Sequence, residues 1–384
     1  MAQHSASSPI AKYFATVARD LESLAAQELT SLGAEQVQPG FCGVAFEGDR
    51  ELLYRVNLWA RLPFRILQQL DVFPCGNADD LYRGIKGIDW QRYLDPGCTL
   101  AVTATGKNSE LNHSHFTALQ VKNAIVDQQQ EQWGERSNVD IDQPDVRINI
   151  HIRHQQCTVS LDSSGDSLHR RGYRPAMGDA PLKESLAAAL IQLSGWTPDQ
   201  AFFDPLCGSG TLPLEASLMA LKMAPGLFRD RFGFETWPDF DRELMERLIA
   251  EAEAGQLDQP PAYIGGSDGN ADILEQARAN ARDCGVAQQV EFQLKALDAV
   301  EAPAQSGLLI CNPPYGERIG GSPEELAEFY RLLGNVLKQR FKGWTAFVLS
   351  GNKDLARNIR LKSTQRIPVN NGGLSCQLMK YELY

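Results

Sequence analysis

The segment Ala201-Phe202-Phe203-Asp204-Pro205-Leu206-Cys207-Gly208-Ser209-Gly210-Thr211 decides the fold of this chain. Its three leading apolar residues form a short strand, and a helical pattern from Leu212 to Lys222 follows the turn. Glycines at 208 and 210 permit positive φ and let a ligand approach the backbone closely. The helix that follows points its free N–H groups at that ligand. The segment therefore predicts a binding loop in an α/β domain.

The chemistry of this turn restricts the ligand. It has neither the lysine of a phosphate-binding loop nor the glycine spacing of a dinucleotide fingerprint. An acidic residue, Asp204, beside a Gly-x-Gly turn suits a ligand with a cationic amino-acid end and a nucleoside end, such as S-adenosylmethionine. A tight strand-to-helix turn without a ligand is the alternative when the segment is considered alone.

A second motif, Asn312-Pro313-Pro314-Tyr315, follows the apolar run Gly307–Cys311. Two prolines cannot continue a strand, so the run ends there and a rigid loop begins. Such a loop lies at the carboxyl edge of the sheet, where open α/β folds bind their ligands. Asn312 Oδ1 and the Pro313 carbonyl can accept the two hydrogens of an exocyclic amino group while Tyr315 stacks on the base. A proline-rich turn with a packing tyrosine is the alternative.

Two more strands place carboxylates at the same edge. Residues 262–267 form a strand that ends at Asp268 and leads into an amphipathic helix over 271–284. Residues 290–294 form another strand, which leads to Asp298. A carboxylate after the second strand is where nucleoside-binding folds hold ribose hydroxyls, and Asp298 can accept the adenine amino group. Four strand ends in this order predict a nucleoside-binding domain.

On these motifs, residues 165–384 resemble a Rossmann-like class I methyltransferase of the N6-adenine/N2-guanine type. Nearly the whole chain is similar to the THUMP-domain N2-guanine RNA methyltransferases, most closely to the half of the bacterial RlmL family that modifies large-subunit rRNA. The segments that carry this resemblance are 161–174, 180–184, 204–211 and 312–318. The extended form Asn-Pro-Pro-Tyr-Gly-Glu-Arg is more specific than its first four residues, which DNA and protein methyltransferases share.

The resemblance implies an α/β enzyme with S-adenosylmethionine as its cofactor. The implied catalytic residues are Asn312, Pro313, Pro314 and Tyr315. The implied cofactor-binding residues are Asp204, Gly208, Gly210, Thr211, Asp268 and Asp298. Two departures stand out. Ala296 occupies the place where close relatives carry an acid, two positions before Asp298, and the second methyltransferase module of the longer family members does not follow the first.

Three domains are expected along the chain: residues 11–65 as a ferredoxin-like module, 66–163 as a THUMP RNA-binding domain and 164–384 as the methyltransferase domain. Short strands and amphipathic helices alternate in the first module in a β-α-β-β-α order. The THUMP assignment comes from the resemblance, since the pattern alone indicates only an α+β accessory domain. Residues 225–260 are longer than a plain crossover needs, and we expect them to cap the pocket or to form a peripheral insertion.

The net charge of −11 is unfavourable for a protein that binds RNA, because phosphate contacts usually dominate affinity. The charge is unevenly distributed, however, since eight lysines and arginines between Lys338 and Arg366 face a single acid, Asp354. Arginines also cluster just before the catalytic domain. Ordinary solvated surface charge is the alternative for these residues. The candidate RNA-binding residues are Lys122, Arg170, Arg171, Arg174, Arg318, Arg357 and Arg360.

The remaining composition excludes several classes of protein. The eight cysteines show no Cys-x-x-Cys pair and no zinc spacing, so we expect reduced thiols, a cytoplasmic location and no metal. No stretch is long and apolar enough to span a bilayer, and residues 1–9 lack the apolar core of a signal peptide. We therefore expect no membrane partner.

The resemblance implies methylation of the exocyclic N2 of a guanine in 23S rRNA, either free or within a ribosome assembly intermediate. A tRNA guanine-N2 methyltransferase of the same architecture is the nearest alternative. A DNA adenine-N6 methyltransferase shares the chemistry of the Asn312 loop. The alternative from another class is an RNA-binding protein with an inactive methyltransferase fold, against which stands the presence of every motif residue needed for chemistry.

Overall fold

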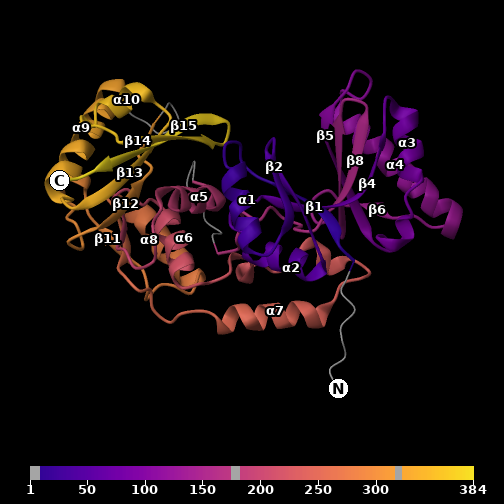
Figure 1. Cartoon of the computed structure of the whole chain (residues 1–384), viewed down its shortest axis with the longest axis horizontal. Helices are drawn as coiled ribbons and strands as arrows, with labels where there is room; N and C mark the ends of the chain where they lie inside the picture. Colours follow the sequence, from indigo (N-terminus) through magenta and orange to yellow (C-terminus); the bar gives the residue numbers. More distant parts are fainter. Residues whose placement is uncertain (1–8, 174–181, 316–321) are drawn as a thin grey trace.

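Residues 9–173, 182–315 and 322–384 are described in the computed structural model of this chain. Arg174 and Arg318, two of the candidate RNA-binding residues, lie outside these ranges. The described residues form two lobes side by side, each built on its own sheet (Figure 1). The first lobe extends from β1 to β8 and the second from α5 to β15.

The first lobe contains one continuous sheet of eight strands in the order β2-β3-β1-β4-β8-β7-β5-β6. Strand β4 (Arg65–Pro74) makes it continuous, because its first residues pair with β1 and most of its length pairs with β8. The expected boundary between residues 65 and 66 therefore falls at the start of a strand that both parts of the lobe share. The other elements are β1 (Ala11–Thr16), α1 (Glu22–Ser31), β2 (Glu35–Gly40), β3 (Gly43–Gly48), α2 (Arg50–Trp59), α3 (Ala78–Lys86), η1 (Trp90–Arg92), β5 (Thr99–Lys107), α4 (Ser114–Trp133), β6 (Asn138–Val139), β7 (Val146–Arg153) and β8 (Gln156–Asp162).

The second lobe contains a seven-stranded sheet in the order β11-β10-β9-β12-β13-β15-β14. Its first five strands are parallel, whereas β15 runs antiparallel to both of its neighbours. The elements are α5 (Glu184–Ser194), β9 (Phe202–Asp204), α6 (Thr211–Ala220), α7 (Arg242–Ala254), β10 (Ile264–Asp268), α8 (Ala271–Asp283), β11 (Glu291–Leu294), η4 (Leu297–Ala299), β12 (Gly307–Cys311), α9 (Pro323–Arg340), β13 (Trp344–Ser350), α10 (Lys353–Arg357), β14 (Gln365–Asn371) and β15 (Leu374–Glu382). This arrangement confirms the expected Rossmann-like α/β fold.

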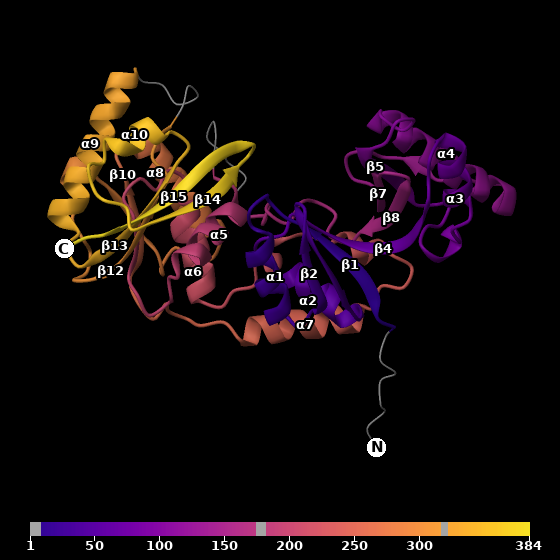
Figure 2. The ribbon, with the colours of Figure 1, turned by 45° about the horizontal axis from the view of Figure 1, so that its top comes forward.

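The order of the parallel strands reverses at β9, which has β10 on one side and β12 on the other. In open α/β sheets, ligands bind outside the carboxyl ends of the strands at such a switch point. The glycine-rich turn follows β9, and the Asn312 loop follows β12. The hairpin formed by β14 and β15 extends from this sheet toward the first lobe (Figures 1 and 2).

The expectation that residues 225–260 cap the pocket is wrong, because this segment fastens the second lobe to the first. It contains η2 (Pro225–Phe228), η3 (Gly233–Thr236) and α7, which runs alongside α2 (Figures 1 and 2). Phe234 stacks on Tyr54 with ring centroids 4.2 Å apart, and Arg247 pairs with Glu51 over 2.8 Å. An amphipathic helix must bury its apolar face somewhere, and the nearest partner is the first lobe.

Candidate active site

The turns after β9 and β10 are tied together by a carboxylate. Asp268, the last residue of β10, accepts a hydrogen bond from the Gly208 N–H over 3.0 Å through Oδ2. Its Oδ1 accepts from the Asn270 N–H over 2.9 Å. Asp204, the last residue of β9, accepts from the Leu206 N–H over 3.0 Å. The predicted residues Asp204, Gly208 and Asp268 therefore lie together at the carboxyl edge.

The two glycines of the turn differ in their surroundings. Both have positive φ, 53° at Gly208 and 84° at Gly210. A Cβ on Gly210 would come within 2.8 Å of the Phe292 ring, so this glycine is needed for packing. A Cβ on Gly208 would meet only Ile273, at 3.9 Å, so this side of the turn is open. An open backbone next to the N-terminus of α6, where Thr211 is buried, fits a cofactor that lies against the turn.

Burial controls the electrostatics of this turn. Asp204 is 2% exposed, and burial followed by the nearby Asp268 carboxylate raises its pKa well above the usual range. Burial also raises the pKa of Cys207 and Cys311, with Asp204 as a second cause for each. A buried carboxyl without a cationic partner favours its protonated form. The turn is therefore suited to a ligand that brings a positive charge to Asp204.

The Asn312 loop presents an unused acceptor. Asn312 Oδ1 is buried and has no hydrogen-bond partner among the described residues. Pro313 is buried, whereas Pro314 and Tyr315 are half-buried. Buried polar atoms in folded proteins are nearly always hydrogen-bonded, so an orphan of this kind calls for an explanation. A substrate group that donates hydrogen bonds would provide one.

The predicted tyrosine is held by the last hairpin of the chain. Asn371 Nδ2 donates to the Tyr315 phenol oxygen over 2.8 Å, and the Cys376 thiol lies 3.6 Å from the same oxygen. Burial raises the pKa of Tyr315. Asn371 was not among the predicted site residues. The Asn-Asn-Gly-Gly stretch at 370–373 signals a hairpin turn, but no local pattern names the distant partner.

Asp298, the residue assigned to adenine, follows the edge strand β11 of the seven-stranded sheet. It is exposed on η4, beyond the end of β11. The backbone of Ala296 lies next to the turn after β10, since its Cα is 3.7 Å from the Cβ position of Gly269. The Lys295 N–H also donates to the Asp268 carbonyl over 3.0 Å. The edge that faces Asp268 therefore carries an alanine where the resemblance implies an acid.

One predicted RNA contact is corrected by the structure. Arg171 is 1% exposed, and its Nε donates to Glu215 Oε1 over 3.3 Å. Its remaining nitrogens donate to the carbonyls of Arg61 and Leu168 over 2.7 and 2.8 Å. Tyr173 donates to the same Glu215 oxygen over 3.0 Å. Arg171 therefore belongs to the buried joint between the lobes, because Glu215 needs a cation there, and it cannot reach RNA.

The other described candidates for RNA contacts are dispersed. Arg170 is exposed in the segment between the lobes, and Lys122 is half-buried on α4 of the first lobe. Arg357 ends α10 and pairs with Asp354 over 2.8 Å, while Arg360 is exposed just beyond that helix. The structure does not bring these four residues into a single cluster.

No helix in the described ranges is both long enough and apolar enough to cross a membrane. No group of three or more histidine, cysteine, aspartate or glutamate side chains in the same ranges is arranged to hold a metal ion.

The reversal at β9, the glycine turn and the Asn-Pro-Pro-Tyr loop place the second lobe among the class I methyltransferases. Comparison with family models identifies the family of each domain. Residues 171–380 match the RMKL-like methyltransferase domain, residues 75–162 the THUMP domain and residues 12–67 the RlmL ferredoxin-like domain. The chain belongs to the RMKL-like methyltransferase family, whose reaction depends on S-adenosylmethionine.

Curated relatives and a solved structure agree with this family. The chain is 58% identical to slr0064 of Synechocystis sp., a candidate RNA methyltransferase, with 97% of each chain covered. It is 42% identical to the ribosomal RNA large subunit methyltransferase K/L of Syntrophotalea carbinolica, covering 97% of this chain and 53% of that protein. The chain thus spans about half the length of the K/L relatives. SMU.472, a candidate methyltransferase crystallised with SAH, superposes with a TM-score of 0.88 at 32% identity, with 98% of each chain covered.

Proposed function

We propose that this protein transfers a methyl group from S-adenosylmethionine to the exocyclic N2 of a guanine in 23S rRNA, either free or within a ribosome assembly intermediate. The observation that carries the proposal is the buried Oδ1 of Asn312, which has no hydrogen-bond partner among the described residues and lies at the switch point of the sheet. The rRNA target is supported by the K/L relatives, whose names state that they act on large-subunit ribosomal RNA. The THUMP domain supports RNA as the substrate class.

The residues at the carboxyl edge are assigned to the cofactor as follows. The open backbone at Gly208, with Gly210 and the buried Thr211 behind it, lies against the amino-acid end. The Asp204 carboxyl faces the ammonium group, because a cation opposes the burial that raises its pKa. Asp268 retains free lone pairs for the ribose hydroxyls. Asp298 is assigned to the adenine amino group.

The Asn312 loop positions the nitrogen that is methylated. The sulfonium of S-adenosylmethionine supplies an electrophilic methyl group. Guanine N2 is a poor nucleophile because its lone pair is delocalised into the ring. Hydrogen bonds from its two N–H groups to Asn312 Oδ1 and to the Pro313 carbonyl localise that lone pair and direct it at the methyl carbon. Pro314 keeps the loop rigid, so this geometry is fixed before the substrate arrives.

No strong base is required in this reaction. The new N–C bond forms as the S–C bond breaks, and the nitrogen becomes cationic before its proton leaves to water. The two carbonyl oxygens stabilise that developing charge. The target guanine must leave its stack, and stacking on Tyr315 restores part of the lost energy, about 1–3 kcal/mol for a base on an aromatic ring.

The test is methyl transfer to separated nucleic acids. Methyl-labelled S-adenosylmethionine is incubated with the protein and unmodified 23S rRNA, 16S rRNA, tRNA or DNA, and labelled nucleosides are identified by mass. N2-methylguanosine in 23S rRNA alone supports the proposal. N2-methylguanosine in tRNA would support the proposed reaction but would contradict 23S rRNA as its target. N6-methyladenine in DNA, or cofactor binding without any methyl transfer, refutes the proposed function.

A further inference from the structure

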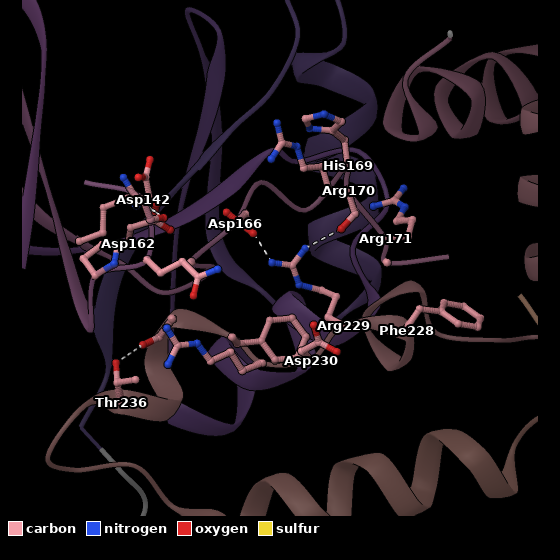
Figure 3. Close-up of a pocket in the computed structure, with 18 of the residues that line it drawn as sticks. Asp142, Asp162, Asp166, His169, Arg170, Arg171, Phe228, Arg229, Asp230 and Thr236 are labelled. Atoms are coloured by element: carbon pink, nitrogen blue, oxygen red, sulfur yellow. Dashed lines mark hydrogen bonds between the residues drawn. The ribbon is translucent and has the colours of Figure 1, made fainter. Parts of the chain in front are cut away.

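A cavity of about 930 Å³ lies where the two lobes meet (Figure 3). Its walls come from residues within four segments: 142–147, 162–172, 182–184 and 228–236. Neither the glycine turn nor the Asn312 loop is part of its lining. The cavity is therefore distinct from the candidate active site, and its volume lies within the range of ligand sites.

Six lysine and arginine residues line this cavity. They are Arg147, Arg170, Arg171, Lys183, Arg229 and Arg231. The acids in the lining are Asp142, Asp145, Asp162, Asp166, Glu184 and Asp230. The two sets are equal in number, so the formal charge alone does not determine the ligand. The charged groups that have no partner within the described residues decide which ligand fits.

Part of the acidic lining is neutralised within the protein. Asp162 pairs with Arg65, a cation that does not belong to the lining. Asp145 Oδ2 accepts hydrogen bonds from the N–H and the hydroxyl of Thr99, both over 2.8 Å. Among the cations of the lining, Arg171 alone forms a salt bridge with a carboxylate of the described residues, Glu215.

Three cations at the rim remain available. Arg170, Lys183 and Arg231 are exposed and form no ion pair with any described residue. The Lys183 ammonium lies 5.3 Å from the centre of the Phe64 ring, which leaves its hydrogen-bond donors free. The pKa of His169 is lowered to about 4, first by burial and then by the nearby charges of Lys183 and Arg170. Three exposed carboxylates of the lining, Asp142, Asp166 and Asp230, also form no ion pair with a described residue. The positive potential is therefore local to Arg170 and Lys183, around His169.

Two buried donors point to the same kind of ligand. The Nε atoms of Arg147 and Arg229 are buried and have no acceptor among the described residues. The other nitrogens of Arg229 donate to the carbonyls of Ser164, Asp166, Ser167 and Arg170 over 2.8 to 3.2 Å, as Figure 3 shows for two of them. This guanidinium is fixed in place with one donor unused. Buried donors of this kind require an oxygen acceptor.

We propose that this cavity is a subsite for a phosphodiester group of the RNA substrate, held by Arg170, Lys183 and Arg231 at the rim and by the unused guanidinium donors below. The subsite rests on the proposed function for the identity of its ligand. Its walls belong to both lobes, so an RNA strand bound there passes from the first lobe to the second at a fixed distance from the Asn312 loop. Local cations also explain how a chain with a net charge of −11 binds a polyanion.

The test measures binding without catalysis. A short, fluorescent, guanine-free oligoribonucleotide is titrated with wild-type protein and with the double variant Arg170→Gln/Arg231→Gln at several salt concentrations. The matched control is Lys12→Gln/Lys222→Gln, which removes two exposed cations that lie outside the cavity lining and outside the basic segment 338–366. Calorimetric binding of S-adenosylmethionine checks that each variant is folded.

We expect the double variant to bind the oligonucleotide roughly tenfold more weakly and to lower the slope of log affinity against log salt by about 1.4, since each single-strand phosphate contact contributes about 0.7. The control should keep wild-type values, and Lys183→Gln should show about half of the effect on the slope. Equal slopes for all variants would refute the subsite. A loss of inorganic phosphate binding with unchanged RNA binding would also refute it, because the site would then take small anions only.

The two proposals can fail separately. Weakened RNA binding in the double variant, together with a wild-type protein that methylates no guanine, would retain the subsite and reject the proposed function. If the wild-type protein methylates guanine and the double variant binds RNA as tightly as wild type, the proposed function is retained and the subsite is rejected.

Discussion

Asn371 and Tyr315, 56 residues apart, are joined by a hydrogen bond of 2.8 Å from the amide nitrogen to the phenol oxygen. This bond connects the β14–β15 hairpin to the loop that follows β12. The Tyr315 ring also packs on Gly351, where a Cβ would lie 2.9 Å from the ring. The orientation of the ring is therefore fixed from two sides, before any base stacks on it.

The first prediction concerns Asn371 as a positioning residue. We expect Asn371→Ala to lower kcat about tenfold, because a misplaced ring costs orientation of the base, with affinity for S-adenosylmethionine unchanged. If Asn371 acts through the phenol, Asn371→Ala combined with Tyr315→Phe should be no worse than either change alone. Methyl-transfer kinetics on all three variants measure this, and additive losses would contradict it.

The second prediction concerns the orphan acceptor. Asn312→Ala should lower kcat by about 10²-fold or more, the loss typical of a preorganised polar group at a reacting centre. S-adenosylmethionine affinity, measured by calorimetry, should stay within about twofold of wild type, because the role proposed for Asn312 is to bind the base and not the cofactor. Loss of both together would make Asn312 a structural residue or a cofactor contact.

The third prediction compares two neighbouring arginines. Arg171→Met should lower the free energy of unfolding by about 3–5 kcal/mol, because Glu215 would remain fully buried without its closest cation. Arg170→Met removes the same charge from an exposed position and should change the free energy of unfolding by no more than about 0.5 kcal/mol. Chemical denaturation of both variants measures the contrast. Equal effects would mean that the buried network is not what joins the lobes.

The fourth prediction concerns stability and pH at His169. Burial and the surrounding cations lower its pKa from 6.5 to about 4 in the folded protein. Between these two values the unfolded chain takes up a proton that the folded chain does not, so His169 makes stability fall as the pH falls from 6.5 to 4. Above pH 6.5 both states are neutral and the effect vanishes.

Between pH 7 and pH 4, the free energy of unfolding of His169→Gln should therefore fall by about 1–2 kcal/mol less than that of wild type, after allowance for partial solvent screening. Unfolding midpoints across that range give the difference. His115→Gln, at an exposed position on α4, is the matched control and should follow the wild-type curve. Parallel curves for wild type and His169→Gln would contradict the prediction.

The fifth prediction separates the two glycines of the turn. Gly210→Ala should destabilise the protein by about 2–3 kcal/mol, since the added Cβ combines positive φ with a clash against Phe292. Gly208→Ala should cost only about 1 kcal/mol for its positive φ, but its Cβ enters the open side of the turn and should weaken S-adenosylmethionine binding at least tenfold. Thermal unfolding and calorimetry measure the two effects, and unchanged cofactor affinity in Gly208→Ala would remove the turn from the cofactor site.

Much of the fold is encoded locally. The strands that end at Asp204, Asp268 and Asn312 are short apolar runs followed by turn residues, and parallel strands bring such ends to one edge of a sheet. β2 (Glu35–Gly40) could not be predicted from its residues, because it is an edge strand of mostly exposed polar residues in which apolar and polar side chains do not alternate. The class of the second lobe could therefore be derived from the chain alone, whereas the edge strand β2 of the first lobe could not.

Partners between distant segments were decided only by the tertiary structure. Arg170 and Arg171 are adjacent and chemically identical, yet one is exposed at the rim of the cavity and the other is buried against Glu215. Helix α7 lies in the segment that we expected to cap the pocket or to form a peripheral insertion, but its apolar face meets α2 and not the pocket. A local pattern fixes the periodicity and the ends of an element, which depend on neighbouring residues. The surface on which a side chain is buried depends on how separate elements pack, and no short stretch of sequence contains that information.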